Sequence, residues 1–130
     1  MDLALTEDQL ALRDAVADLL AKESPPERVR AAEPAGFDPA LWALVTDMGL
    51  PSLAVAEDAG GGGGSMADLA VVAEEFGRRV AAVPLIEAAA ATDLLAHVGA
   101  GALLEEVLSA PLLPTVALRP ALKGVLRLVP

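Results

Sequence analysis

Cysteine and tyrosine are absent from this chain of 130 residues, and aromatic residues of any kind are scarce. Without cysteine the chain has no disulfide, no thiolate metal site and no cysteine nucleophile. Phe37, Trp42 and Phe76 are its only aromatic side chains, so the core has to be built from aliphatic residues. Alanine and leucine dominate these, which favours helices over a sheet.

Basic residues are also few: 9 Lys and Arg stand against 19 Asp and Glu, for a net charge of −10. Binding to nucleic acid is therefore not expected, because it requires basic surface and aromatic stacking platforms. Long apolar runs are missing as well, since none approaches the roughly 20 residues that cross a bilayer. The acidic start M-D-L-A-L-T-E-D does not resemble a signal peptide. We expect a cytoplasmic protein with no membrane span.

Capping patterns and apolar spacing predict five helices. The first begins at Thr6, where Gln9 three residues later completes a capping box, and it ends before Pro25-Pro26. Three further signals are Pro39 after Asp38, Gly49 as a left-handed stop, and a Ser cap before the apolar face of the third helix. The later helices are expected to begin at Asp38, at Ser65, near Leu85 and after Gly101.

The segments between these helices carry turn or strand signals. Residues 27–37 are predicted to be a loop or a broken turn, residues 51–56 an extended segment, and residues 59–64 a flexible glycine loop. After Pro111 the sequences T-V-A-L-R-P and G-V-L-R-L-V-P are of β type, without partner strands beyond each other. The predicted fold is all-α: a five-helix, up-and-down bundle-like domain over residues 1–110. Residues 111–130 are predicted to be a linker and the start of a β-domain whose remainder is missing.

The glycine run allows a second interpretation. Gly62, Gly64 and Ala67 match a loose dinucleotide-binding fingerprint, with Glu87 as the acidic residue about 20 positions on. Glu57 and Asp58, directly before the glycines, would repel a phosphate. The required second strand would also contain a proline, which a central strand tolerates poorly. A plain connecting loop is the favoured interpretation.

Four motifs in order resemble the amino-terminal domain of the acyl-CoA dehydrogenases. They are L-T-E-D-Q-L-A-L-R at residues 5–13, L-W-A-L-V-T-D-M-G-L at residues 41–50, V-A-E-D-A-G-G-G-G at residues 55–63 and E-E-F-G-R at residues 74–78. Each motif alone is weak, but four with compatible spacing are specific. The resemblance covers about residues 3–118.

The resemblance implies an FAD-dependent enzyme that desaturates an acyl-CoA thioester at its α,β-bond. The complete family fold has a helical domain, a β-domain and a carboxyl-terminal helical domain that supplies the catalytic glutamate, so no residue of this chain matches that base. It also implies homo- or hetero-oligomeric subunits. By position in the family pattern, Pro84, Leu85 and Ala88 are candidates for the wall of the acyl pocket, although alanine there equally permits close helix packing. No cofactor or metal is expected on this chain alone.

The sequence departs from the family where a flavin-side motif is expected. Near Val116–Ala121, Arg119 replaces a glutamate, and only the strand and Pro120 match. The family resemblance thus leaves a second hypothesis open, in which the chain is a non-catalytic helical interaction module that docks on a catalytic partner subunit.

Other charged residues have simple structural interpretations. Glu74 and Glu75 are adjacent on a helix and point about 100° apart, so they are no catalytic pair, and Glu75 with Arg79 is expected to form a surface ion pair. Asp93 and His97 lack the further ligands that a metal would need. Lys123 and Arg127 could meet the phosphates of CoA but are more simply surface charge.

Overall fold

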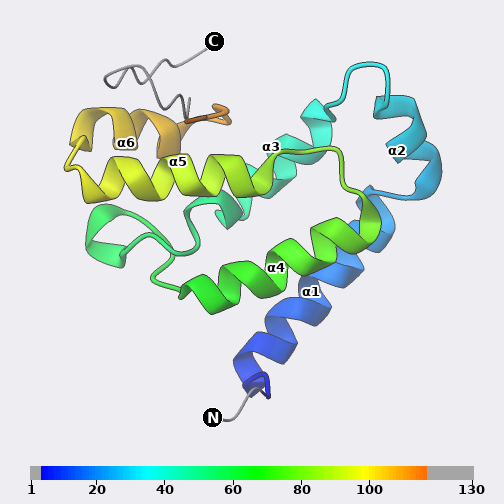
Figure 1. Ribbon diagram of the computed structural model, residues 1–130, viewed down its shortest axis with the longest axis horizontal. Helices are drawn as coiled ribbons and strands as arrows, with labels where there is room; N and C mark the ends of the chain where they lie inside the picture. Colours follow the sequence, from blue (N-terminus) through cyan, green and yellow to red (C-terminus); the bar gives the residue numbers. More distant parts are fainter. Residues whose placement is uncertain (1–3, 117–130) are drawn as a thin grey trace, which may run out of the picture.

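The computed structural model describes residues 4–116, and these form an all-α domain, as predicted (Figure 1). The described residues contain no strand. Six α-helices and two 3₁₀ helices follow one another: α1 (Glu7–Glu23), α2 (Pro26–Ala32), α3 (Pro39–Asp47), η1 (Leu50–Ser52), η2 (Glu57–Ala59), α4 (Met66–Arg79), α5 (Leu85–His97) and α6 (Gly101–Ser109). None of these helices combines the length and the apolar character needed to cross a bilayer.

The helices form two packed groups. The long helix α1 lies against α4, while α5 lies against η1 on one side and α6 on the other (Figure 1). The predicted capping box at Thr6 is present, and the predicted cap at Ser65 forms a second capping box with Asp68. The third residues of the two helices are also joined, because Gln9 Nε2 donates to Asp68 Oδ1 at 2.9 Å. The starts of α1 and α4 are therefore held together.

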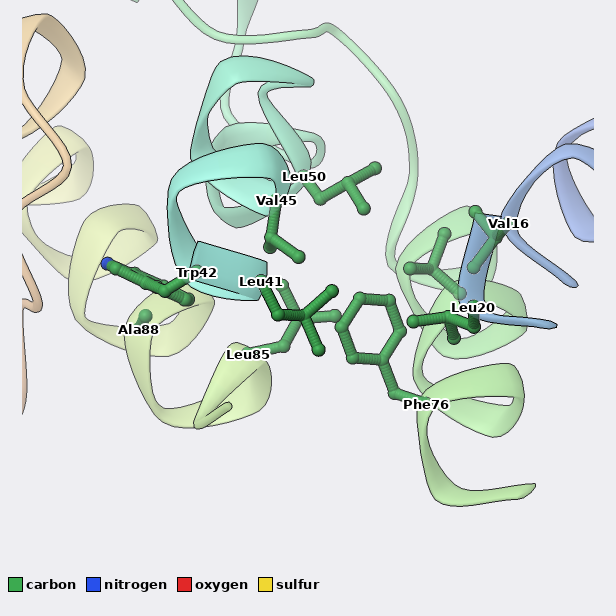
Figure 2. Close-up of a cluster of buried hydrophobic side chains, with 10 residues drawn as sticks. Val16, Leu20, Leu41, Trp42, Val45, Leu50, Phe76, Leu85 and Ala88 are labelled. Carbon is green, nitrogen blue, oxygen red and sulfur yellow. The ribbon is translucent and has the colours of Figure 1, made fainter. Parts of the chain in front are cut away.

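Most of the buried apolar residues belong to one cluster. It gathers side chains from α1, α3, η1, α4 and α5 (Figure 2). Its members are Val16, Leu20, Leu41, Trp42, Val45, Leu50, Val72, Phe76, Leu85 and Ala88. We call this set the main core. A smaller cluster of Leu95, Leu104 and Val107 lies between α5 and α6, and we call it the minor core.

The expected loop at residues 27–37 is wrong in its first half, which forms α2. Pro26 occupies the start of this helix, a position that suits proline because its missing N–H would have no partner there. The helix contains no buried residue, so it lacks the apolar stripe by which helices are recognised. Residues 33–36 then form a turn that leads to the start of α3.

The expected extended segment at residues 51–56 is also wrong. Gly49 has the predicted left-handed conformation, with φ of 71°, and it ends α3. Leu50–Ser52 then continue as the 3₁₀ helix η1, followed by a turn. Leu50 and Val55 are buried, so the segment contributes to the interior without forming a strand.

The glycine run is a fixed structure and not the flexible loop that its composition suggests. The amides of residues 60–64 all donate to carbonyls of residues 52–57, over 2.8 to 3.0 Å. At Gly61 a Cβ would overlap the backbone and side chain of Val55. Glycine is needed here so that two backbone segments can approach closely. Because neither flanking segment is a strand, the dinucleotide interpretation is also wrong.

The predicted β-type tail falls mainly on residues 117–130, which lie outside the described residues, as do Arg119, Lys123 and Arg127.

Candidate functional site

The three predicted pocket residues lie at the beginning of α5. Pro84 occupies the N-cap position and is half-buried, while Leu85 and Ala88 are fully buried in the main core (Figure 2). Ala88 lies beside Trp42 in this view. None of the three lines either of the two grooves described below, so their role as an acyl-pocket wall stays a prediction.

The first groove lies between α3, η1 and the chain that follows α6. Its cavity volume is about 530 Å³. Both hydroxyl groups and apolar side chains line it, and Asp47 is its one carboxylate among the lining residues. Thr46, Ser52 and Ser109 donate their hydroxyl protons to carbonyls of their own turns, so their oxygens remain available as acceptors.

The second groove is about 1100 Å³ in volume and lies between η2, the end of α5 and α6. Four carboxylates line it: Glu57, Asp58, Glu105 and Glu106. The two grooves share Gly60, Leu108 and Ser109 along their boundary. The concentration of negative charge disfavours the phosphates of a CoA group in the second groove.

The outer face of α5 carries an unpartnered apolar stripe. Ile86, Ala90 and Leu94 on α5 and Val98 at its C-cap are all exposed and follow at intervals of four residues, which places them along one side of the helix and its end. Ile86 is 51% exposed and Val98 is 61% exposed. We call these four residues the α5 stripe.

Glu74 and Glu75 on α4 form an ion network with Arg78 instead of a catalytic pair. Arg78 contacts both Glu74 and Glu75, so the predicted partner of Glu75, Arg79, is wrong. Glu75 is only 7% exposed, which its position beside Phe76 in the sequence did not reveal. Both glutamates raise the pKa of Arg78, mainly through its hydrogen bond to Glu74.

Asp93 and His97 lie on the last turns of α5. His97 Nδ1 is 3.3 Å from Asp93 Oδ1, and the histidine side chain is 74% exposed. In the part of the chain that the structure describes, no three His, Asp or Glu side chains converge as metal ligands. The pair is therefore a solvated contact within one helix.

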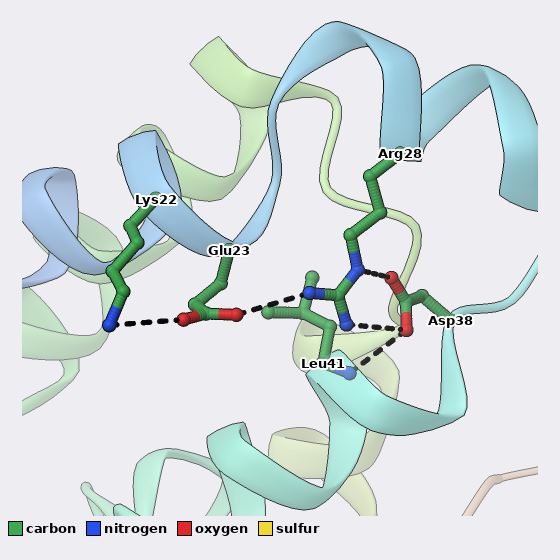
Figure 3. Close-up of polar contacts among 5 residues, drawn as sticks. All are labelled: Lys22, Glu23, Arg28, Asp38 and Leu41. Carbon is green, nitrogen blue, oxygen red and sulfur yellow. Dashed lines mark hydrogen bonds and ion pairs between the residues drawn. The ribbon is translucent and has the colours of Figure 1, made fainter.

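One charged network joins three helices. Arg28 on α2 binds both carboxylate oxygens of Asp38, at 2.6 and 3.1 Å, and also reaches Glu23 at the end of α1 (Figure 3). Asp38 simultaneously caps α3 by accepting from the Leu41 amide at 2.9 Å. The hydrogen bond from Arg28 is the main cause of the lowered pKa of Asp38. This network fixes the helix junction and opens on neither groove.

One polar contact beside the first groove was not predicted from the sequence. Trp42 Nε1 donates to the carbonyl of Pro111 at 3.1 Å, across 69 positions of sequence. A buried indole needs such an acceptor, but nothing local identifies it. Within residues 4–116 no buried side-chain nitrogen or oxygen lacks a hydrogen-bond partner.

Comparison with known proteins gives the family. The family described as "Acyl-CoA dehydrogenase, N-terminal domain" matches residues 6–111. The chain is 39% identical over 119 residues to acyl-CoA dehydrogenase IpdE2 of Mycolicibacterium smegmatis, covering 89% of this chain and 38% of that protein. It is 41% identical over 83 residues to acyl-CoA dehydrogenase IpdE2 of Mycobacterium tuberculosis, covering 62% of this chain and 26% of that protein. No solved structure matches significantly.

The family match spans all six α-helices and the capping boxes at Thr6 and Ser65. It ends at residue 111, shortly before the last described residue. The chain spans less than half the length of either relative, so the match concerns one domain. This chain belongs to the acyl-CoA dehydrogenase family and corresponds to its amino-terminal helical domain.

Proposed function

We propose that this chain serves as the helical amino-terminal domain of an FAD-dependent enzyme that introduces an α,β-double bond into an acyl-CoA thioester. The family match over residues 6–111 is the observation that carries this proposal. In the complete enzyme FAD would accept the hydride, and a glutamate of another domain would remove the proton. The described residues supply neither, so their part is to shape the acyl pocket and to hold the domains together.

The residues proposed for the pocket wall are Pro84, Leu85 and Ala88. They lie where α5 begins, and the buried face of this helix is rich in alanine. Small side chains there let α5 approach its neighbours closely and leave room for an acyl tail beyond the main core. The acidic second groove is not proposed as the CoA site, because its carboxylates oppose the phosphates.

The α5 stripe is proposed as a contact with the other domains. A single exposed apolar residue is common on protein surfaces, but four of them along one side of a helix form a continuous apolar patch, which is typical of a contact surface. We propose that the helical domain extends over residues 1–110 and that residues 111–130 lead into the next domain. A cytoplasmic location remains a prediction.

Substrate preference tests the proposed wall. Ala88→Val in the enzyme as isolated from its native host should shift activity toward shorter acyl-CoA substrates, because the added methyl groups narrow the pocket. Ala91→Val is the matched control, since Ala91 is equally buried on the same helix. Equal shifts in both variants, or loss of stability without a shift, would assign Ala88 to packing alone.

A second proposed function is a non-catalytic helical module that docks on a catalytic partner subunit. Its support is that Arg119 stands where the family pattern has a glutamate. Affinity purification of the tagged chain with its native neighbours separates the two proposals. Flavin absorbance that depends on a second polypeptide supports the module, and flavin held by one continuous polypeptide that contains this domain supports the enzyme.

A further inference from the structure

We infer that α6 and the segment after it open from the rest of the domain as a unit, while the main core stays closed. We call this unit the α6 latch and define it as residues 101–114. The inference concerns a conformational device and does not depend on the proposed catalytic function.

The helix of the latch has little stability of its own. It is 9 residues long and its N-cap, Ala100, makes no side-chain capping bond. Isolated helices shorter than about 12 residues are marginal in water. Its last turn contains Glu106 and no basic residue, and a negative charge at this end is unfavourable to the helix dipole. The last turn of α4, by contrast, carries two arginines, which are favourable there.

Packing around the latch is also limited. The minor core that holds it contains three buried residues, against ten in the main core. The two grooves lie on either side of α6, so much of its circumference faces open volume. Side chains that border a cavity lose contacts with partner atoms on that side. The latch is therefore held by a much smaller core than the other helices that contribute buried residues.

Two contacts beyond the minor core connect the latch to the domain. One is the hydrogen bond from the Trp42 indole to the Pro111 carbonyl. The other is the close approach of Leu108 to Gly60, where an added Cβ would lie 3.1 Å from Leu108 Cδ1. Opening breaks these contacts and the minor core and leaves the main core intact. Regions with so few buried contacts open at lower free energy than the whole domain.

Opening has a consequence for the grooves. Because Leu108 and Ser109 form their shared boundary, moving the latch merges the two grooves into one surface. The hydroxyl-lined groove beside α3 then becomes continuous with the carboxylate-lined groove beside η2.

Native-state amide hydrogen exchange on the full 130-residue chain tests the inference. Amides of α6 should exchange at least about tenfold faster than buried amides of α1 and α4, equivalent to about 1.4 kcal/mol. Low concentrations of urea should accelerate exchange in α1 and α4 while leaving α6 almost unchanged, because latch opening exposes little surface. A single exchange free energy across all helices would overturn the inference.

A variant in the main core gives the sharper test. Val72→Ala destabilises the closed state and the latch-open state equally, because Val72 belongs to the main core in both. Exchange in α1 and α4 should therefore accelerate about tenfold or more, while exchange in α6 stays within about twofold of wild type. Equal acceleration in α6 would show that α6 opens only by global unfolding.

The tryptophan bond supplies a matched pair of variants. Trp42→Phe removes the bond to Pro111 and should accelerate exchange in α6 about fivefold. Phe76→Leu alters another aromatic residue of the main core that makes no such bond, and it should leave α6 exchange unchanged. Unchanged α6 exchange in Trp42→Phe would show that this contact does not hold the latch.

Discussion

At the scale of single residues, two glycines differ in whether a larger side chain would fit. A Cβ at Gly61 would collide with Val55, whereas one at Gly77 on α4 would meet nothing within 4 Å. We expect Gly61→Ala to lower the free energy of unfolding by about 1 to 3 kcal/mol. Gly77→Ala should raise it by about 0.5 to 1 kcal/mol, because alanine loses less entropy in a helix. Urea denaturation of both variants measures this, and destabilisation by Gly77→Ala would contradict it.

Val80 is the one non-glycine residue with positive φ in the described chain, at 50°. It follows the end of α4, where a left-handed glycine is usual, and its side chain is 70% exposed. Val80→Gly should therefore raise the free energy of unfolding by about 0.5 to 1 kcal/mol, since it relieves steric strain without losing buried contacts. Thermal denaturation checks this, and a lower melting temperature than wild type would oppose it.

At the scale of elements, the Arg28–Asp38 pair joins α2 to α3. Asp38→Asn retains a cap for α3 but removes the ionic bond, and should cost about 1 to 2 kcal/mol near pH 7. Because folding lowers the pKa of Asp38, its contribution is present above the unfolded value of about 3.9 and disappears as pH falls through the folded value. Urea denaturation at pH 7 and pH 3 should show the difference narrowing in acid. Glu27→Gln, at an exposed acid of α2, should show no such difference at either pH.

Elements defined by local hydrogen bonds, such as helix caps, were predictable from the sequence. Elements defined by contacts between distant residues were not. Thr6, Asp38 and Ser65 begin helices because their caps bond three residues ahead. The glycine loop depends on carbonyls of residues 52–57, and its composition alone suggests flexibility. For the candidate site, sequence motifs predicted the family and the position where α5 begins. The grooves and the Trp42 bond arise only when α6 and the segment after it pack on the rest of the domain.

At the scale of the whole molecule, the α5 stripe should govern association. We expect the isolated chain to associate as its concentration rises, because Ile86 and Leu94 leave apolar area in contact with water. Ile86→Ser with Leu94→Ser should shift it toward monomer in sedimentation velocity. Val80→Ser removes an exposed apolar side chain away from the stripe and serves as control. Wild-type protein that stays monomeric at every concentration would contradict the prediction.

The bond between Gln9 and Asp68 has a consequence for biosynthesis. Its two partners are separated by 59 positions, so α1 leaves the ribosome well before the helix that covers it exists. At translation rates of about 5 to 20 residues per second, the delay is about 3 to 12 s. Throughout that interval Val16 and Leu20 have no burial partner on α4, so the apolar face of nascent α1 stays in contact with solvent.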